Sequence, residues 1–273
     1  MTSKRARAIL VRTATGASLA GVLALVLWVT AVVDRSWPVL AIGAALALGL
    51  VVEFGRMGAW AGRRVTAPGL AALGVAIAAL ATADGRAFAY PLAFAVALVV
   101  AVAVRSRGAL GVATAATWIT VPLPALALVW DVYGQGGLVA LVVLSKIGDV
   151  AGYYGGNAFG KHHPFPQLSP GKTTEGCVAS FLAGCAAGPL CGALGLVDGA
   201  FGLPALVLAG AVVNLAAQAG DLLESRVKRR AGVKDSSTWL GASGGLLDVT
   251  DSLLVTVPVA LATWPFLCSA VAR

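Results

Sequence analysis

Charged residues are scarce in this chain: they make up 12% of its 273 residues, whereas hydrophobic residues make up 59%. Soluble globular domains carry about 25% charged residues. So few charges cannot cover the apolar surface of a protein in water, which excludes a soluble enzyme, a secreted disulfide scaffold and a disordered tail. The apolar stretches are continuous and lack the alternation of a transmembrane β-barrel. We therefore expect an all-α, polytopic integral membrane protein.

Cysteine is also rare, with four residues and no Cys-x-x-Cys pair. All of them lie in apolar runs, where a free cysteine behaves as a small hydrophobic residue. They are Cys177, Cys185, Cys191 and Cys268. We expect neither a disulfide nor a zinc site from them.

Apolar runs of a length suited to a bilayer recur along the chain, and we expect about nine membrane-spanning helices. They cover residues 15–33, 37–52, 68–83, 87–104, 109–130, 136–156, 177–197, 203–220 and 246–268. Most of the 20 lysines and arginines fall in alternate connections that share one side of the membrane. The positive-inside rule then places the N-terminus in the cytoplasm and the C-terminus outside.

The two halves of the chain differ in their acidic residues. Residues 1–135 hold four, at span ends or in loops, and residues 136–273 hold eight. Acidic residues at membrane depth are costly and usually functional. We therefore expect residues 1–135 to form N-terminal transmembrane helices, and residues 136–273 to form a C-terminal transmembrane region that carries the chemistry.

Glycines recur at intervals of four in two expected spans. One series is Gly152, Gly156 and Gly160, and the other is Gly184, Gly188 and Gly192. Such small faces let membrane helices approach closely. We expect close helix packing at both series.

A glycine-rich polar segment begins near the end of the sixth expected span. Residues 149–161 read Asp-Val-Ala-Gly-Tyr-Tyr-Gly-Gly-Asn-Ala-Phe-Gly-Lys, and residues 168–176 read Leu-Ser-Pro-Gly-Lys-Thr-Thr-Glu-Gly. Glycine lets backbone N–H groups approach a phosphate, and lysine adds positive charge. The segment is a candidate phosphate-binding loop, and a glycine-rich packing turn with topology lysines is the alternative.

Two carboxylate pairs flank a basic segment near the eighth and ninth expected spans. Asp221 and Glu224 are three positions apart, as are Asp248 and Asp251, so each pair shares a helix face. The basic residues that follow the first pair are Arg226, Lys228, Arg229 and Arg230. Hard cations take carboxylate oxygens, and Mg²⁺ typically uses few carboxylates together with substrate phosphates. The pattern predicts a site for a divalent metal and a polyphosphate; the alternative is that these acids only mark the membrane interface.

Taken together, these segments resemble the phosphatidate cytidylyltransferases, or CDP-diacylglycerol synthases. The resemblance rests on Gly220-Asp-Leu-Leu-Glu-Ser-Arg-Val-Lys-Arg229, Lys234-Asp235, Gly244-Gly-Leu-Leu-Asp-Val-Thr-Asp-Ser252, Ser169-Pro-Gly-Lys-Thr-Thr-Glu-Gly176 and the segment that starts at Asp149. Their order and spacing agree with the family over residues 149–252. The chain departs from the family pattern at four positions, where Ser243 replaces a histidine, Val249 and Asn157 replace arginines, and Gly171 replaces a lysine. It is therefore similar to a divergent member.

The resemblance implies a nucleotidyltransferase that moves a cytidylyl group from CTP to phosphatidic acid, giving CDP-diacylglycerol and pyrophosphate in phospholipid biosynthesis. It implies Mg²⁺ or another hard divalent cation, with the ligands Asp221, Asp248, Glu224 and Asp251. The catalytic residues that it implies are Asp221, Asp248 and Lys234. The substrate-binding residues that it implies are Ser169, Lys172, Thr173, Ser225, Arg226, Lys228 and Arg229.

The expected partners are CTP and phosphatidic acid in the bilayer, without nucleic acid and with a homodimer left open. The expected location is the cell membrane, with the active site facing the cytoplasm. Two alternatives remain: a related enzyme of the same fold that uses CTP or another lipid phosphate, and a degenerate paralogue that binds lipid or nucleotide without turnover. A transporter is disfavoured because the charges gather at one face and are not spread through several spans.

Overall fold

The computed structural model of the chain describes residues 18, 21–57, 70–72, 74, 76, 109–197 and 202–269. Within these ranges all the regular secondary structure is helical, and no described residue belongs to a β-strand. The all-α expectation is confirmed for this part of the chain.

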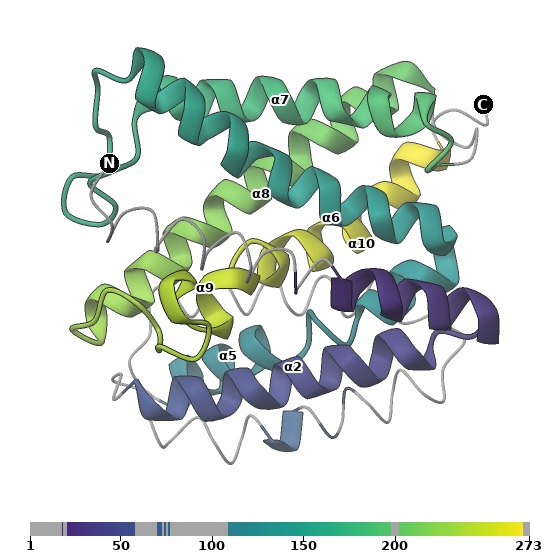
Figure 1. Cartoon of the computed structure of the whole chain (residues 1–273), viewed down its shortest axis with the longest axis horizontal. Coiled ribbons are helices and arrows are strands. Elements are labelled where there is room, and N and C mark those ends of the chain that lie inside the picture. The colour runs from purple at the N-terminus through teal and green to yellow at the C-terminus, as the bar shows by residue number, and fades with distance from the viewer. Residues whose placement is uncertain are drawn as a thin grey trace.

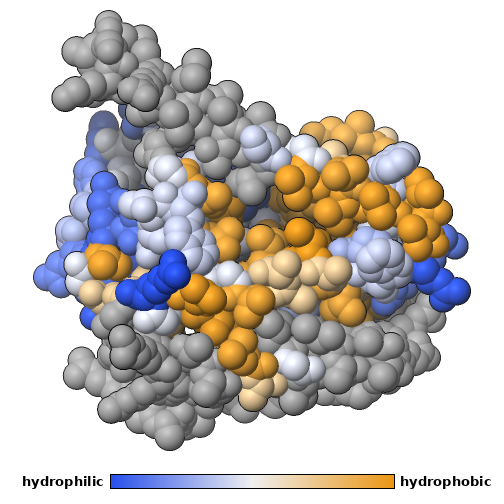
Figure 2. Space-filling view, turned by 60° about the horizontal axis from the view of Figure 1, so that its bottom comes forward, coloured by the Kyte–Doolittle hydropathy of each residue, from blue (hydrophilic) through white to orange (hydrophobic). Residues whose placement is uncertain are grey.

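Five of the described helical stretches are long and apolar enough to cross a membrane. They are α2 (Trp37–Arg56), α6 (Leu126–Phe159), α7 (Thr174–Ala193), α8 (Leu203–Arg230) and the stretch Leu246–Leu267, which contains α9 (Leu246–Thr250) and most of α10 (Leu253–Ser269). A shorter apolar helix covers Gly21–Val33, and α5 covers Ala109–Thr120. Figure 2 shows apolar residues over the middle of the described surface and hydrophilic residues toward its two ends, as expected of helices that cross lipid.

The helix boundaries differ from the sequence prediction around residues 109–135. The expected span 109–130 is interrupted, because α5 ends at Thr120 and a turn with Pro122 and Pro124 precedes α6. Proline has no N–H with which to continue a helix. In place of the expected connection at 131–135, α6 has a kink at Gly134, whose φ of 67° and ψ of −170° are non-helical. Most of the expected spans 68–83 and 87–104 lies outside the described residues.

Helix α8 also runs ten residues beyond the expected end of its span, from 220 to Arg230. The polar segment after residue 220 keeps one side buried, with Glu224 and Val227 on it. Lysine and arginine fill its last turn, where positive charge complements the helix dipole. Lys228 therefore stands on the same helix as Asp221 and Glu224, whereas the sequence analysis placed it in a loop.

The described helices pack around two buried apolar clusters. One joins α6, α7, α8 and α10 through residues such as Leu141, Val213 and Leu261. The other joins α2, α5 and the region of α9 and α10 through residues such as Leu50 and Leu254. Figure 1 shows that the C-terminal ends of α2 and α8 and the short helix α9 lie at the same end of the bundle. Side chains from the two halves of the chain can therefore meet there.

Glycine contacts bring α6, α7 and α8 close together. A Cβ atom added at Gly188 on α7 would collide with the carbonyl oxygen of Leu206 on α8, and one at Gly210 would collide with that of Gly184. A Cβ at Gly176 would lie 2.8 Å from the carbonyl oxygen of Gly152 on α6. The predicted close packing at both glycine series is confirmed.

Candidate functional site

Three carboxylates meet at the end of the bundle where α8 passes the junction of α9 and α10. Asp221 and Glu224 stand on α8, and Asp251 follows α9 directly. One carboxylate oxygen of each lies within 4.8 Å of the others. Gly220 permits this approach, since a Cβ there would lie 2.8 Å from the backbone oxygen of Asp251. The side chain of Glu224 is 2% exposed, so this carboxylate is held away from bulk water.

This geometry suits a hard divalent cation. Mg²⁺ lies about 2.0–2.1 Å and Ca²⁺ about 2.3–2.6 Å from oxygen ligands, so two oxygens on one ion lie at most about 4–5 Å apart. Oxygen Oε1 of Glu224 is buried and has no hydrogen bond of acceptable geometry among the described residues, although an ammonium group is close to it. The group formed by the carboxylates of Asp221, Glu224 and Asp251 is therefore compatible with a bound divalent cation.

Each of the three carboxylates also has a lysine beside it, and the lysines come from three different elements. One precedes α7, one stands on α8 and one on α6. The pairs, with the distances from Nζ to the carboxylate oxygen, are Lys172–Asp221 at 2.6 Å, Lys228–Glu224 at 2.5 Å and Lys146–Asp251 at 3.4 Å. Anionic and cationic groups are thus interleaved within the site.

Lys146 is a site residue that the sequence analysis missed. Its amine donates a hydrogen bond to the backbone oxygen of Val249 at 2.9 Å and lies 3.9 Å from Oδ2 of Asp149. Lysine within a membrane-spanning helix is rare and usually functional. That signal was available, because Lys146 interrupts an apolar run, but basic residues were considered only in the connections between spans.

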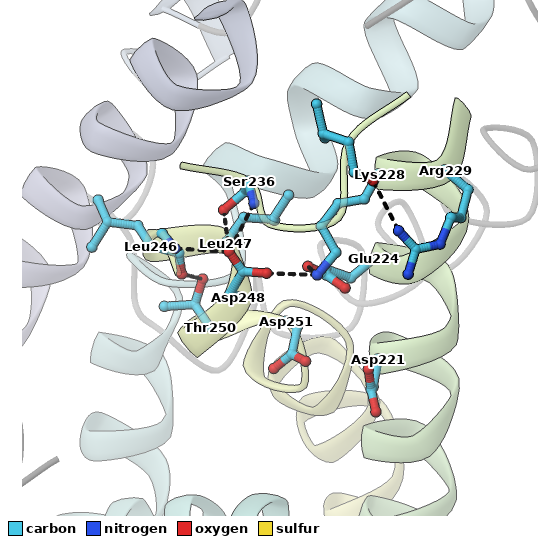
Figure 3. A network of polar contacts seen from close by, with 12 residues as sticks. Asp221, Glu224, Lys228, Arg229, Ser236, Leu246, Leu247, Asp248, Thr250 and Asp251 are labelled. Atoms are coloured by element: carbon cyan, nitrogen blue, oxygen red, sulfur yellow. Dashed lines mark hydrogen bonds and ion pairs between the residues drawn. The ribbon is translucent and has the colours of Figure 1, made fainter. Parts of the chain in front are cut away.

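Asp248 lies outside the three-carboxylate group, although the sequence paired it with Asp221. Its Oδ1 is 2.6 Å from Nζ of Lys228, and its Oδ2 accepts hydrogen bonds from the backbone N–H groups of Ser236 and Gly245 at 2.9 and 2.7 Å. Figure 3 shows the carboxylate turned toward Lys228 and Ser236. Asp248 occupies the third position of α9, from which a carboxylate folds back onto the helix start. Asp251, one turn later, takes the predicted place of Asp248 beside Asp221.

A further carboxylate reaches the start of α9 from the N-terminal half of the chain. Glu53 on α2 is 1% exposed. Its Oε1 accepts hydrogen bonds from the Ser236 hydroxyl at 2.9 Å and from the Leu246 N–H at 3.1 Å, and its Oε2 accepts one from the Leu247 N–H at 2.9 Å. The sequence analysis treated Glu53 as a span-end acid, because nothing in the sequence connects it with residues almost 200 positions later.

A pocket of about 320 Å³ opens beside Asp221, between α6, α7 and α8. It is lined by three predicted substrate-binding residues, Ser169, Lys172 and Thr173, and by Asp149. The Thr173 hydroxyl already caps α7, since it accepts a hydrogen bond from the N–H of Gly176 at 3.1 Å. Ser169 and Lys172 are thus the predicted residues best placed to contact a phosphate in the pocket.

Beside the pocket lies an amide and hydroxyl network that the sequence analysis also missed; Cys177, Ser180 and Gln218 of this network line the pocket. Buried Asn214 on α8 donates a hydrogen bond to Ser180 on α7 at 3.2 Å. Gln218 donates to Oδ1 of Asn214 at 2.8 Å and to the backbone oxygen of Cys177 at 3.3 Å. Polar side chains that bond across membrane helices hold them together, so this network fixes the distance between the pocket walls.

The other predicted residues lie outside the pocket lining. Ser225 is buried on α8. Arg226, Arg229 and Lys234 are exposed, and Arg229 donates a hydrogen bond to the backbone oxygen of Val233 at 3.0 Å. Their roles in binding phosphate stay predictions.

Comparison with known proteins shows that this chain matches a protein family. The sequence profile described as the cytidylyltransferase family matches residues 10–267. The phosphatidate cytidylyltransferase of Brucella suis biovar 1 is 37% identical over 122 residues, which cover 45% of this chain and 44% of that protein. The phosphatidate cytidylyltransferase of Pseudomonas aeruginosa is 38% identical over 125 residues, which cover 46% of each chain.

A third similar protein is YnbB of Escherichia coli K12, which is named as uncharacterized. It is 36% identical over 132 residues, which cover 46% of this chain and 42% of YnbB. In all three comparisons, the matched part of the chain spans less than half the length of the relative.

Proposed function

The chain belongs to the cytidylyltransferase family, and from this premise we propose that it transfers a cytidylyl group from CTP to phosphatidic acid. The products are CDP-diacylglycerol and pyrophosphate. The observation that carries the proposal is the group of three carboxylates with its lysines, beside a pocket at one end of a bundle of membrane-spanning helices. Such a place is accessible both to a lipid phosphate from the bilayer and to a nucleotide from water.

In the proposed reaction, a phosphate oxygen of the lipid attacks the α-phosphorus of CTP, and the bond to the departing pyrophosphate breaks. Displacement at phosphorus depends mainly on positioning and on neutralising negative charge. Asp221, Glu224 and Asp251 would hold a divalent cation, Mg²⁺ by the family resemblance, which supplies Lewis-acid stabilisation of the phosphate oxygens when bound. Ser169 and Lys172 hold phosphate oxygens in the pocket.

The residues around Asp248 have a positioning role in this proposal. Asp248 and Glu224 hold the ammonium group of Lys228 between them, at 2.6 and 2.5 Å. The two carboxylates keep this ammonium group beside the site, from which its flexible stem lets it turn toward a substrate phosphate. Arg226, Arg229, Lys234 and Ser225 supply further contacts to the polyphosphate from the end of α8 and the loop that follows it.

In this proposal the protein lies in the cell membrane and has about nine spans. Its N-terminus is cytoplasmic and its site faces the cytoplasm. Residues 1–135 form the N-terminal helices and residues 136–273 the region that carries the site. A homodimer and the absence of a nucleic-acid partner also stay as predictions. The alternation of basic connections supports the orientation.

The test is turnover by the purified full chain in detergent, supplied with CTP, phosphatidic acid and Mg²⁺. We expect lipid-linked cytidine and pyrophosphate in equal amounts, and neither product when a chelator removes the metal. Binding of both substrates without release of pyrophosphate would contradict the proposal and favour a non-catalytic paralogue. Turnover with a different lipid phosphate alone would favour a related enzyme of the same fold.

A further inference from the structure

The three carboxylates that suit a divalent cation are already engaged by ammonium groups. Asp221, Glu224 and Asp251 each have one lysine nitrogen within 2.5–3.4 Å. Two neighbouring acids lie close to two of these lysines, since Asp149 lies 3.9 Å from Lys146 and Asp248 lies 2.6 Å from Lys228. The lysines are thus counter-cations built into the site.

A divalent cation and these ammonium groups compete for the same carboxylates. A cation bound among the three oxygens would lie close to positively charged nitrogens, and like charges at such distances repel strongly where water is partly excluded. Burial strengthens this competition, because the exposed fraction of the side chain is 37% for Lys146, 20% for Lys172 and 11% for Lys228. The lysines therefore weaken the binding of a cation that arrives alone.

A phosphate group in the pocket changes this balance. Lysine carries its charge on a flexible four-carbon stem with three donors, so it can turn from one anion to another nearby. Lys172 lines the pocket itself. Lys146 lies 3.9 Å from Asp149, which is another residue of the pocket lining. A phosphate there can take up ammonium groups while the carboxylates take up the divalent cation.

We propose that Lys146, Lys172 and Lys228 are exchangeable counter-cations that make the divalent cation and the phosphate-bearing substrate bind cooperatively. When either ligand binds alone, the carboxylates and lysines of the site are still paired with one another. When both bind, the carboxylates pair with the divalent cation and the lysines pair with the phosphate. By thermodynamic linkage, the factor by which phosphate raises the affinity for the cation equals the factor by which the cation raises the affinity for phosphate. The inference rests on the cation site of the proposed function, but it does not require turnover.

Lys146 gives the sharpest test, because it contacts Asp251 from a separate helix. The experiment measures Mn²⁺ binding to the purified full chain in detergent without nucleotide, from the electron paramagnetic resonance signal of free Mn²⁺. Lys146→Met should bind Mn²⁺ about three- to tenfold more tightly than the unaltered protein, as expected for removing one partly screened positive charge a few ångströms away. Lys146→Arg keeps the charge and should bind as the unaltered protein does. Arg35→Met, which removes a positive charge at an exposed position with no role in the site, is the control and should also show no change.

The second half of the experiment repeats the titrations with inorganic phosphate, which binds Mn²⁺ only weakly in solution. Phosphate should tighten Mn²⁺ binding by the unaltered protein, and by a smaller factor in Lys146→Met. A purely structural role for Lys146 would weaken Mn²⁺ binding or lower the melting temperature, and would not tighten binding. If Lys146→Met does not fold, Lys172→Met in the connection before α7 provides the same comparison.

The outcomes separate this inference from the proposed function. If the unaltered protein binds Mn²⁺ and the lysine variants bind it equally or less tightly, the counter-cation inference is wrong and the cation site stands. If no variant binds Mn²⁺, with or without phosphate, the cation site itself is wrong, and the inference falls with it.

Discussion

The carboxylate of Glu53 and the hydroxyl of Ser236 lie 2.9 Å apart, although 183 positions separate them in the chain. The same hydroxyl lies 2.6 Å from Oδ2 of Asp248. It has one hydrogen and can donate to only one of the two carboxylates at a time. The backbone N–H groups of Leu246 and Leu247 also point at Glu53. The first half of the chain thus holds the turn from which Asp248 and Asp251 project.

Replacing Glu53 should therefore loosen the start of α9. Glu53→Ala leaves the backbone N–H groups of Leu246 and Leu247 without their acceptor, whereas the Ser236 hydroxyl can still donate to Asp248. We expect a loss of about 1–3 kcal/mol in stability for buried groups left unsatisfied. Glu53→Gln keeps one acceptor oxygen and should lose less. Thermal unfolding in detergent measures both effects. Asp131→Ala, an exposed acid on α6, is the control, and equal melting temperatures for all three variants would contradict the assigned role of Glu53.

The sequence predicted the helical class and several of the spans well, because long apolar runs leave few other structures in lipid. The break at Pro122 and Pro124 was missed because the residues around it stay apolar, so hydropathy alone carries no sign of a turn. The extension of α8 to Arg230 was missed for the opposite reason. Polar residues looked like a loop, whereas one side of that segment is buried against α2, α5 and α9.

The site was predicted less completely than the fold. Spacing correctly put Asp221 and Glu224 on one helix face, since residues three apart are neighbours there. The same spacing could not say which of Asp248 and Asp251 turns toward α8. That choice depends on Ser236 and the start of α9, which bind Asp248. Glu53 and Lys146 enter through contacts between distant helices, which local spacing does not encode.

The contact between α7 and α8 gives a second prediction. In Gly188→Ala, the added methyl group would collide with the backbone oxygen of Leu206. Overpacking of this kind costs about 1–3 kcal/mol, and we expect a lower melting temperature in detergent. Gly21→Ala is the matched control, because a Cβ there meets no atom of the described residues within 4 Å and alanine favours helix over glycine. A melting temperature for Gly188→Ala equal to that of the control would show that the two helices can move apart freely.

The orientation of the chain gives a third prediction. Alternating basic connections place the N-terminus in the cytoplasm and the C-terminus outside. Cysteines introduced at Ala6 and Ala272, in a background without the four native cysteines, should react with an impermeant reagent from opposite sides of the membrane. Both positions lie outside the described residues. Reaction of both cysteines from the same side would exclude an odd number of spans, and with it the predicted nine.

The final prediction separates the roles of Asp221 and Asp248. Asp221→Asn removes a charge from the three-carboxylate group, so both Mn²⁺ binding and turnover should fall, turnover by about 10²-fold or more, as for the loss of a major electrostatic contact. Asp248→Asn removes a partner of Lys228 and Ser236 outside that group. It should lower turnover while leaving Mn²⁺ binding much closer to that of the unaltered protein.

The comparison uses the same substitution at an exposed acid, Asp131→Asn, which should change neither quantity. Asparagine keeps the size of aspartate, so a loss of turnover in a protein with an unchanged elution profile reports on charge and not on folding. Should Asp248→Asn abolish Mn²⁺ binding as fully as Asp221→Asn does, the cation would lie between those two carboxylates, as the sequence predicted, and the group with Glu224 and Asp251 would not be the metal site. Should neither variant lose turnover, both acids are interface residues, and the reaction does not pass through this end of the bundle.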